Sequence, residues 1–202
     1  IIPYSQSLAR LPAHIQQVEM ESNGKVAKTD SRFKGNENVS QIIFGEPGTN
    51  AQHSFFQLLH QGRICAVDFI GFSKSYNKHI INEKDPHHIL IANMLAQSDA
   101  LALGKNNENS SKQFDGNRPS TVLLFKDGLS SFNLGVILSL YEHRTTVMGF
   151  LNGINSFDQF GVELGKEMAV SYLLNLGKNI ENSNIANLPA NDLINYFNNN
   201  CI

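Results

Sequence analysis

The sequence predicts an α/β fold with three layers, αβα, in which a mainly parallel sheet lies between helices. Short runs rich in Ile, Val and Phe alternate with longer helical patterns, and this order implies βαβ units. The composition, 41% hydrophobic and 17% charged, is ordinary for a soluble globular protein. No apolar run approaches the roughly 18 residues that a membrane helix needs.

The chain begins with a predicted helix over residues 1–21. Apolar residues recur at spacings of three and four, at Leu8, Leu11, Ile15 and Val18. Pro3 suits a first helical turn, and Pro12 would kink or divide the helix. A turn is expected at 22–24, followed by a polar, irregular stretch over 25–40.

A short strand is predicted at 41–44, and the Gly-Glu-Pro-Gly turn at 45–48 follows it. Thr49 and Gln52 have the spacing of a capping box, which predicts a helix that opens there and runs through Leu59. Ligands of parallel α/β sheets gather at the carboxyl ends of strands, next to helix N-termini. The turn therefore lies where such a site is expected.

The rest of the chain continues the alternation. The predicted elements are a buried strand at 63–72, a helix at 86–103, a loop at 105–113, a strand at 120–125, a helix at 132–150 with a brief strand near 147–151, and a helix at 157–175. Gly104 is the expected C-terminal cap of the second of these, and Ser156 with Gln159 has capping-box spacing. One domain over 1–176 is expected, then an Asn-rich tail over 177–202 with an amphipathic patch at 193–197.

Charge and cysteine content exclude several classes of partner. The net charge is −2 and the pI about 6.4, so no basic field is available for nucleic acid or anionic lipid. Cys65 and Cys201 cannot form a disulfide framework, and Cys65 is expected as a buried small hydrophobe. The N-terminus does not have the pattern of a signal peptide. These features predict a cytoplasmic protein without nucleic-acid or membrane partners.

Familiar catalytic and metal-binding motifs are missing. The sequence contains no G-x-S-x-G elbow, P-loop, paired C-x-x-C or H-E-x-x-H. The adjacent His87 and His88 would diverge on a helix, so they are poor joint ligands, and no metal site is expected. Residues 114–120, FDGNRPS, consist mostly of turn formers, so their expected role is structural.

Three polar segments remain as candidate sites. Glu21 lies at a helix end against an Asn-Gly turn, although a solvated acidic helix end is the commoner explanation for such a residue. His53 is expected in the first turn of a helix, where the dipole disfavours the imidazolium; an ordinary surface histidine is the alternative. Gln159, Glu163 and Lys166 share one helix face, which would also suit a simple surface ion pair. Gly165 costs this helix roughly 1 kcal/mol relative to alanine, and such a cost often marks close packing or a nearby ligand.

Six motifs taken together resemble one enzyme family. They are MESNGK, GEPGTNAQHSFFQLLHQG, HHILIANMLAQSDALALGK, GNRPS, LYEHR and NSFDQFGVELGK, which cover the chain to about Lys166. In this order they resemble glucose-6-phosphate isomerase. The resemblance implies a sugar isomerase domain, flavodoxin-like or Rossmann-like, in a homodimeric enzyme that needs no metal or organic cofactor. It also implies conversion between glucose 6-phosphate and fructose 6-phosphate through a cis-enediol.

The resemblance also implies roles for single residues. Glu21 of MESNGK matches the base that moves the proton between carbons 1 and 2. His53 of GTNAQH matches a residue that helps to open the sugar ring in the partner subunit's site. Lys166 of VELGK matches a residue that assists ring opening, and Gln17 and Gln159 match glutamines that contact the substrate.

The chain departs from the family in two signatures. A Gly-Gly-Arg-Tyr-Ser-like segment, whose arginine stabilises the enediolate, is absent, and so is a Ser/Thr-rich phosphate loop. Both belong to the family's N-terminal half, so the chain is expected to be a C-terminal catalytic portion with little activity alone. The alternative is a non-catalytic module for sugar-phosphate binding or dimerisation. Such a module should have lost Glu21, His53 or Lys166, and all three are present.

Overall fold

A computed structural model describes residues 1–25, 40–76, 80, 85–176 and 189–200. Residues 26–39 of the predicted irregular stretch lie outside these ranges, and so do residues 177–188 of the predicted tail and Cys201. The chain divides into two compact units, Ile1–Ser156 and Phe157–Ile202. The predicted domain boundary at residue 176 stays a prediction.

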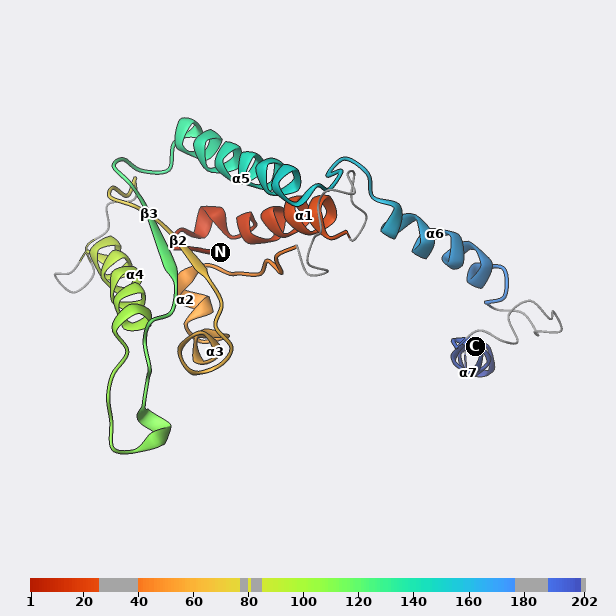
Figure 1. The fold of residues 1–202 in the computed structure, drawn as a ribbon, viewed down its shortest axis with the longest axis horizontal. Helices are drawn as coiled ribbons and strands as arrows, with labels where there is room; N and C mark the ends of the chain where they lie inside the picture. Colours follow the sequence, from red (N-terminus) through yellow and green to blue (C-terminus); the bar gives the residue numbers. More distant parts are fainter. Residues whose placement is uncertain (26–39, 77–79, 81–84, 177–188, 201–202) are drawn as a thin grey trace. The chain divides into compact units, whose positions relative to one another are not determined.

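A parallel sheet forms the middle of the first unit (Figure 1). Strands β1 (Ile2–Pro3), β2 (Val67–Phe72) and β3 (Ser120–Phe125) lie in the order β1-β2-β3, and both pairings are parallel. In the register, Phe69 faces Ile2 on one side and Val122 on the other. The predicted α/β class with a parallel sheet is confirmed. The predicted strand at 63–72 was too long, because only its buried part from Val67 pairs with a neighbour.

Alternation along β2 supplies a core on each face of the sheet. On one face Phe69 packs with residues of α2 (Gly48–Ala51), α3 (Phe56–Gln61) and α4 (Pro86–Leu103), as part of the cluster Ile2, Tyr4, Ala51, Phe56, Leu59, Val67, Phe69, Met94 and Leu101. On the other face Ile70 packs with α1 (Leu11–Asn23) and α5 (Ser131–Asn152), in the cluster Leu8, Leu11, Ile15, Ile43, Ile70, Phe72, Ile137 and Tyr141. Figure 1 shows α1 and α5 together on one side of the strands and α4 on the other. The first unit therefore has the predicted three layers.

The predicted helix over 1–21 was wrong at its start. Residues 2–3 form β1, a 3-10 turn covers Gln6–Leu8, and α1 begins only at Leu11. The Tyr4 amide donates to the Ile70 carbonyl at 2.7 Å, which extends the pairing of the first strand. Pro12 lies in the first turn of α1, where a missing N–H costs nothing. Of the two expected effects of this proline, a kink or a division of the helix, the division is the one observed.

Two predictions between residues 41 and 59 were also wrong. Residues 41–44 form no strand: Ile42 is 78% exposed, and no strand of the described residues forms a ladder with this segment, although the Ile1 ammonium donates to the Phe44 carbonyl at 2.8 Å. The single predicted helix is two short ones, α2 (Gly48–Ala51) and α3, separated by a turn. The N-cap of α2 is Pro47 without a side-chain bond, so the expected Thr49 capping box does not form.

Two helices that end at a glycine, α4 and α5, match the predictions closely. Helix α4 spans Pro86–Leu103, and Gly104 ends it with φ of 64°. Helix α5 continues to Asn152 and ends at Gly153 in the left-handed conformation, so the brief strand expected near 147–151 was wrong. The predicted loop at 105–113 contains a 3-10 turn, Ser110–Lys112.

The second unit contains two helices, α6 (Phe160–Leu173) and α7 (Asn191–Asn200). Helix α6 starts three residues later than predicted, and Gln159 is its N-cap rather than part of a Ser156 capping box. Within the described ranges, no helix is long and apolar enough to cross a membrane. Those ranges also contain no cluster of His, Cys, Asp or Glu that could hold a metal ion.

Candidate active site at the end of helix α1

Glu21 and Gln17 lie together on the exposed side of α1. They are four residues apart, so they share a helix face, and the Gln17 Nε2 donates to the Glu21 Oε1 at 3.5 Å. Glu21 stands in the last turn of the helix, which ends where the Gly24 amide donates to the Met20 carbonyl at 3.0 Å. The result is a solvent-accessible carboxylate with an amide beside it. Of the predicted site residues, these two are brought together.

A buried polar network lies on the opposite side of the same helix end; we call Glu19, Asn23, Thr145 and Ser156 the Glu19 network. Glu19 is 1% exposed and Asn23 is fully buried. The Thr145 hydroxyl donates to the Glu19 Oε2 at 2.7 Å, and the Asn23 Nδ2 donates to the Glu19 Oε1 at 3.2 Å. The same Nδ2 donates to the Thr145 carbonyl at 2.9 Å, while the Ser156 hydroxyl donates to the Asn23 Oδ1 at 2.8 Å.

The sequence pattern did not single out this network. Its one local signal is that Glu19 and Asn23 continue the buried stripe of Leu11 and Ile15 at a spacing of four. A carboxylate on an apolar stripe predicts a buried partner, but that partner, Thr145, lies 126 positions away in the sequence. Sequence spacing therefore could not identify it.

Two further features close the network. A Cβ added to Gly149 of α5 would lie 2.1 Å from the Ser156 Oγ and 3.0 Å from the Asn23 Oδ1, so only glycine admits Ser156 here. The Lys25 Nζ donates to the Asn155 carbonyl at 2.7 Å. Two hydrogen bonds therefore join the end of α1 to the segment after α5: Ser156 to Asn23, and Lys25 to Asn155.

His53 lies in another part of the first unit. Its side chain is exposed, and it stands in the turn between α2 and α3, where its amide donates to the Asn50 carbonyl at 3.0 Å. The expectation that it occupies the first turn of a helix was wrong, because α2 has already ended at Ala51. Figure 1 shows α2 apart from the end of α1, the helix end that carries Glu21. Glu21 and His53 are therefore not brought together within one chain.

Buried contacts fix the turn that presents His53. The Gln52 Nε2 donates to the Tyr4 hydroxyl at 3.1 Å. A Cβ on Gly48 would lie 2.3 Å from the Tyr4 ring, so this glycine lets the two segments pack. Burial raises the pKa of Tyr4 to about 12, against a smaller lowering by the Gln52 hydrogen bond. Tyr4 is therefore a neutral phenol at physiological pH.

Gln159 and Lys166 belong to the second unit. Gln159 caps α6, where its carbonyl accepts from the Val162 amide at 3.1 Å, and Lys166 lies further along the helix; both side chains are exposed. The sequence suggested close packing or a ligand near Gly165. Among the described residues, no atom lies within 4 Å of a Cβ placed there. The backbone at Gly165 is open.

Arg118 of FDGNRPS has the structural role that was predicted. Its Nη1 donates to the Gly62 carbonyl at 3.0 Å, and its amide donates to the Leu101 carbonyl at 3.0 Å. Gly116 and Asn117 both have positive φ, 66° and 52°. The segment is a tight turn that leads into β3.

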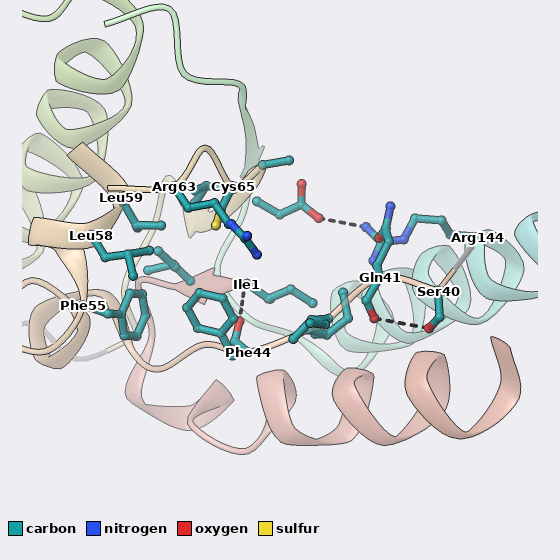
Figure 2. Close-up of a pocket in the computed structure, with 16 residues that line it drawn as sticks. Ile1, Ser40, Gln41, Phe44, Phe55, Leu58, Leu59, Arg63, Cys65 and Arg144 are labelled. Carbon is teal, nitrogen blue, oxygen red and sulfur yellow. Dashed lines mark hydrogen bonds and ion pairs between the residues drawn. The ribbon is translucent and has the colours of Figure 1, made fainter. Parts of the chain in front are cut away.

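A separate cavity of about 610 Å³ lies at the amino end of β2 (Figure 2). Figure 2 shows Arg63 and Cys65 on one side of it and Arg144 on another. Arg144 Nη1 donates to the Asp68 Oδ2 at 3.0 Å, and Tyr141 donates to the same oxygen at 3.1 Å. None of the predicted site residues lines this cavity. Cys65, expected to be buried, is only half-buried.

Comparison with known proteins gives a consistent result. The sequence model of phosphoglucose isomerase matches residues 1–192. The glucose-6-phosphate isomerase of Chlamydia pneumoniae is 49% identical over 98% of this chain and 37% of that protein. The cytosolic B form of Oryza sativa is 50% identical over 84% of this chain and 32% of that protein. The chain thus spans about a third of the length of the curated relatives that it matches.

Solved structures agree. A crystal structure of a glucose-6-phosphate isomerase from Chlamydia trachomatis matches with a TM-score of 0.79 and 42% identity, over 98% of this chain and 37% of that one. The hypothetical protein TT0462 of Thermus thermophilus matches with a TM-score of 0.64 at 23% identity, over 85% of this chain and 40% of that one. The second match shows a shared fold alone.

Proposed function

This chain belongs to the phosphoglucose isomerase family, and from that premise we propose that it is the C-terminal catalytic portion of a glucose-6-phosphate isomerase. The activity is the interconversion of glucose 6-phosphate and fructose 6-phosphate in glycolysis and gluconeogenesis. The observation that carries the proposal is the exposed Glu21 carboxylate beside Gln17, on a helix end anchored by buried hydrogen bonds.

In the proposed mechanism Glu21 is the base. Its carboxylate takes the proton from carbon 2 of the open-chain aldose, and the electrons pass to the carbonyl oxygen of carbon 1. A proton shifts from the hydroxyl of carbon 2 to that oxygen through the cis-enediol, and the resulting carboxylic acid returns its proton to carbon 1 as the carbonyl forms at carbon 2. The Gln17 amide, next to the Glu21 oxygen, would contact the substrate and help to orient it.

His53 and Lys166 are assigned to ring opening, and Gln159 to substrate contact. His53 lies away from Glu21 in one chain, which supports its contribution to the site of a partner subunit in a homodimer. Lys166 on α6 and Gln159, the N-cap of the same helix, are both exposed and so available to a ligand. Several relatives are named as cytosolic forms, which supports a cytoplasmic location.

A chimera tests the proposal. The 202 residues replace the corresponding segment of the Chlamydia pneumoniae relative, which supplies the remaining part of the enzyme. We expect the chimera to convert fructose 6-phosphate and the 202-residue chain alone to have little activity. A folded, dimeric chimera that binds sugar phosphate without turning it over would instead support a non-catalytic binding module. Strong activity of the chain alone would contradict its assignment as a dependent portion.

A further inference from the structure

We propose that the Glu19 network is a positioning device: it holds the Glu21 carboxylate in place for proton transfer and ties the same helix end to the segment that leads to Gln159. This inference rests on the proposed function. It adds Glu19, Asn23, Thr145 and Ser156 as positioning residues, none of which needs to touch the substrate.

The first step is the geometry of one helix turn. Residues two apart in an α-helix point about 200° from each other, since each residue advances 100°. Glu19 is 1% exposed and Glu21 is exposed, so the two carboxylates lie on opposite sides of α1. Any rotation of the helix end that moved Glu21 would also pull Glu19 out of its hydrogen bonds. The buried carboxylate therefore fixes the direction of the exposed one.

The second step is that the fixing contacts are directional. Both Glu19 oxygens accept hydrogen bonds, one from the Thr145 hydroxyl and one from the Asn23 amide. Apolar packing alone would tolerate small slides and rotations of the helix end, whereas hydrogen bonds weaken steeply when their angles change. A buried polar group left without its partner is also costly, so one arrangement is strongly preferred.

The third step is the link to the other candidate residues. Ser156 donates to Asn23, and it stands three positions before Gln159 in the sequence. The Ile154 amide donates to the Gly149 carbonyl at 2.9 Å, so this segment is also held against the end of α5. The network thus fixes the last residue of the first unit together with the helix end that carries Glu21.

The test removes one donor from the network with little change of shape. Thr145→Val deletes the hydroxyl that donates to Glu19, and Thr145→Ser keeps it. Thr146→Val is the matched control, because that neighbouring hydroxyl donates within α5, to the Glu142 carbonyl at 3.0 Å, and not to the Glu19 network. The variants are made in the chimera and in the 202-residue chain.

We expect Thr145→Val to lower kcat of the chimera about 10–100-fold with little change in KM, since small misplacement of a catalytic group has costs of that size. Thr145→Ser should restore most of kcat, and Thr146→Val should leave it unchanged. In the 202-residue chain, amide hydrogen exchange over residues 20–25 should speed up in Thr145→Val and not in Thr146→Val, while β2 and β3 keep their protection.

Two outcomes would overturn the proposal. One is a folded Thr145→Val chimera that keeps kcat within about twofold of the parent; the other is unchanged exchange at residues 20–25. If Thr145→Val does not fold, Ser156→Ala, at the edge of the network, is judged by the same two criteria. Hydrogen exchange does not need turnover, so an inactive parent chimera would refute the proposed function while the exchange result still decides the role of the network.

Discussion

Gly149 offers a sharp quantitative prediction, because two arguments about it disagree. Alanine is a better helix former than glycine by about 1 kcal/mol, so propensity alone favours Gly149→Ala in α5. The structure opposes it: the new Cβ would lie 2.1 Å from the Ser156 Oγ and 3.0 Å from the Asn23 Oδ1. Overpacking of this kind costs about 1–3 kcal/mol. Displacement of Ser156 would add the loss of its hydrogen bond to Asn23, about 1 kcal/mol.

The balance is a net loss. We expect Gly149→Ala to lower the free energy of unfolding by about 1–3 kcal/mol. Gly135→Ala in the same helix is the control, because its position is exposed and, in the part of the chain that the structure describes, no atom lies within 4 Å of a Cβ placed there. That variant should raise the free energy of unfolding by about 0.5–1 kcal/mol.

Urea denaturation followed by far-UV circular dichroism measures both variants of the 202-residue chain. The two alanine variants should differ by about 1.5–4 kcal/mol, in opposite directions from the parent. If Gly149→Ala is as stable as Gly135→Ala, the close approach of Ser156 to α5 does not exist in solution. The geometry of the Glu19 network would then be wrong as well.

Three further predictions concern the sheet and the turn that presents His53. Tyr141→Phe removes the hydroxyl that donates to Asp68, and should lower the free energy of unfolding by about 1 kcal/mol in urea denaturation; an unchanged value would contradict a native bond. Gly48→Ala should cost about 1–3 kcal/mol in the same assay, because its Cβ would meet the Tyr4 ring at 2.3 Å; a neutral effect would place Tyr4 elsewhere. The raised pKa of Tyr4, about 12, means that the folded state keeps a proton that the unfolded state releases above its pKa near 10. The free energy of unfolding should therefore fall as the pH rises from about 10 to about 12, and less steeply in Tyr4→Phe; an equal slope in both proteins would contradict burial of this phenol.

Elements whose ends depend on nearby residues were predicted well. Pro86 marks the start of α4 and Gly104 marks its end, and β3 was predicted with its observed bounds. The errors came from signals whose outcome depends on distant partners. The segment 41–44 has strand-forming residues and lies next to Ile1, whose ammonium donates to the Phe44 carbonyl, but it forms no ladder with a described strand. By contrast, β1 is a strand because β2 lies beside it.

The candidate site shows the same division. Glu21 and Gln17 follow from a spacing of four on one helix, and the structure places them together. Ser156 has capping-box spacing with Gln159, yet its hydroxyl bonds to Asn23, 133 positions away. The buried hydrogen bond to Asn23 forms in place of the expected helix cap at Ser156. Local sequence patterns span only a few residues, so they could not pair Ser156 with Asn23. For that reason the Glu19 network could only be found in the structure.

The central claim is that Glu21 is the base of an isomerase, and one measurement tests it most directly. The chimera and its Glu21→Gln variant are incubated with glucose 6-phosphate in deuterium oxide, and turnover and deuterium incorporation at carbon 2 are followed. We expect Glu21→Gln to lower kcat by about 10²–10⁴-fold and to suppress incorporation, because the amide cannot accept the proton. Glu108→Gln, at an exposed loop residue, should behave like the parent. Turnover and incorporation that survive in Glu21→Gln would contradict the assignment.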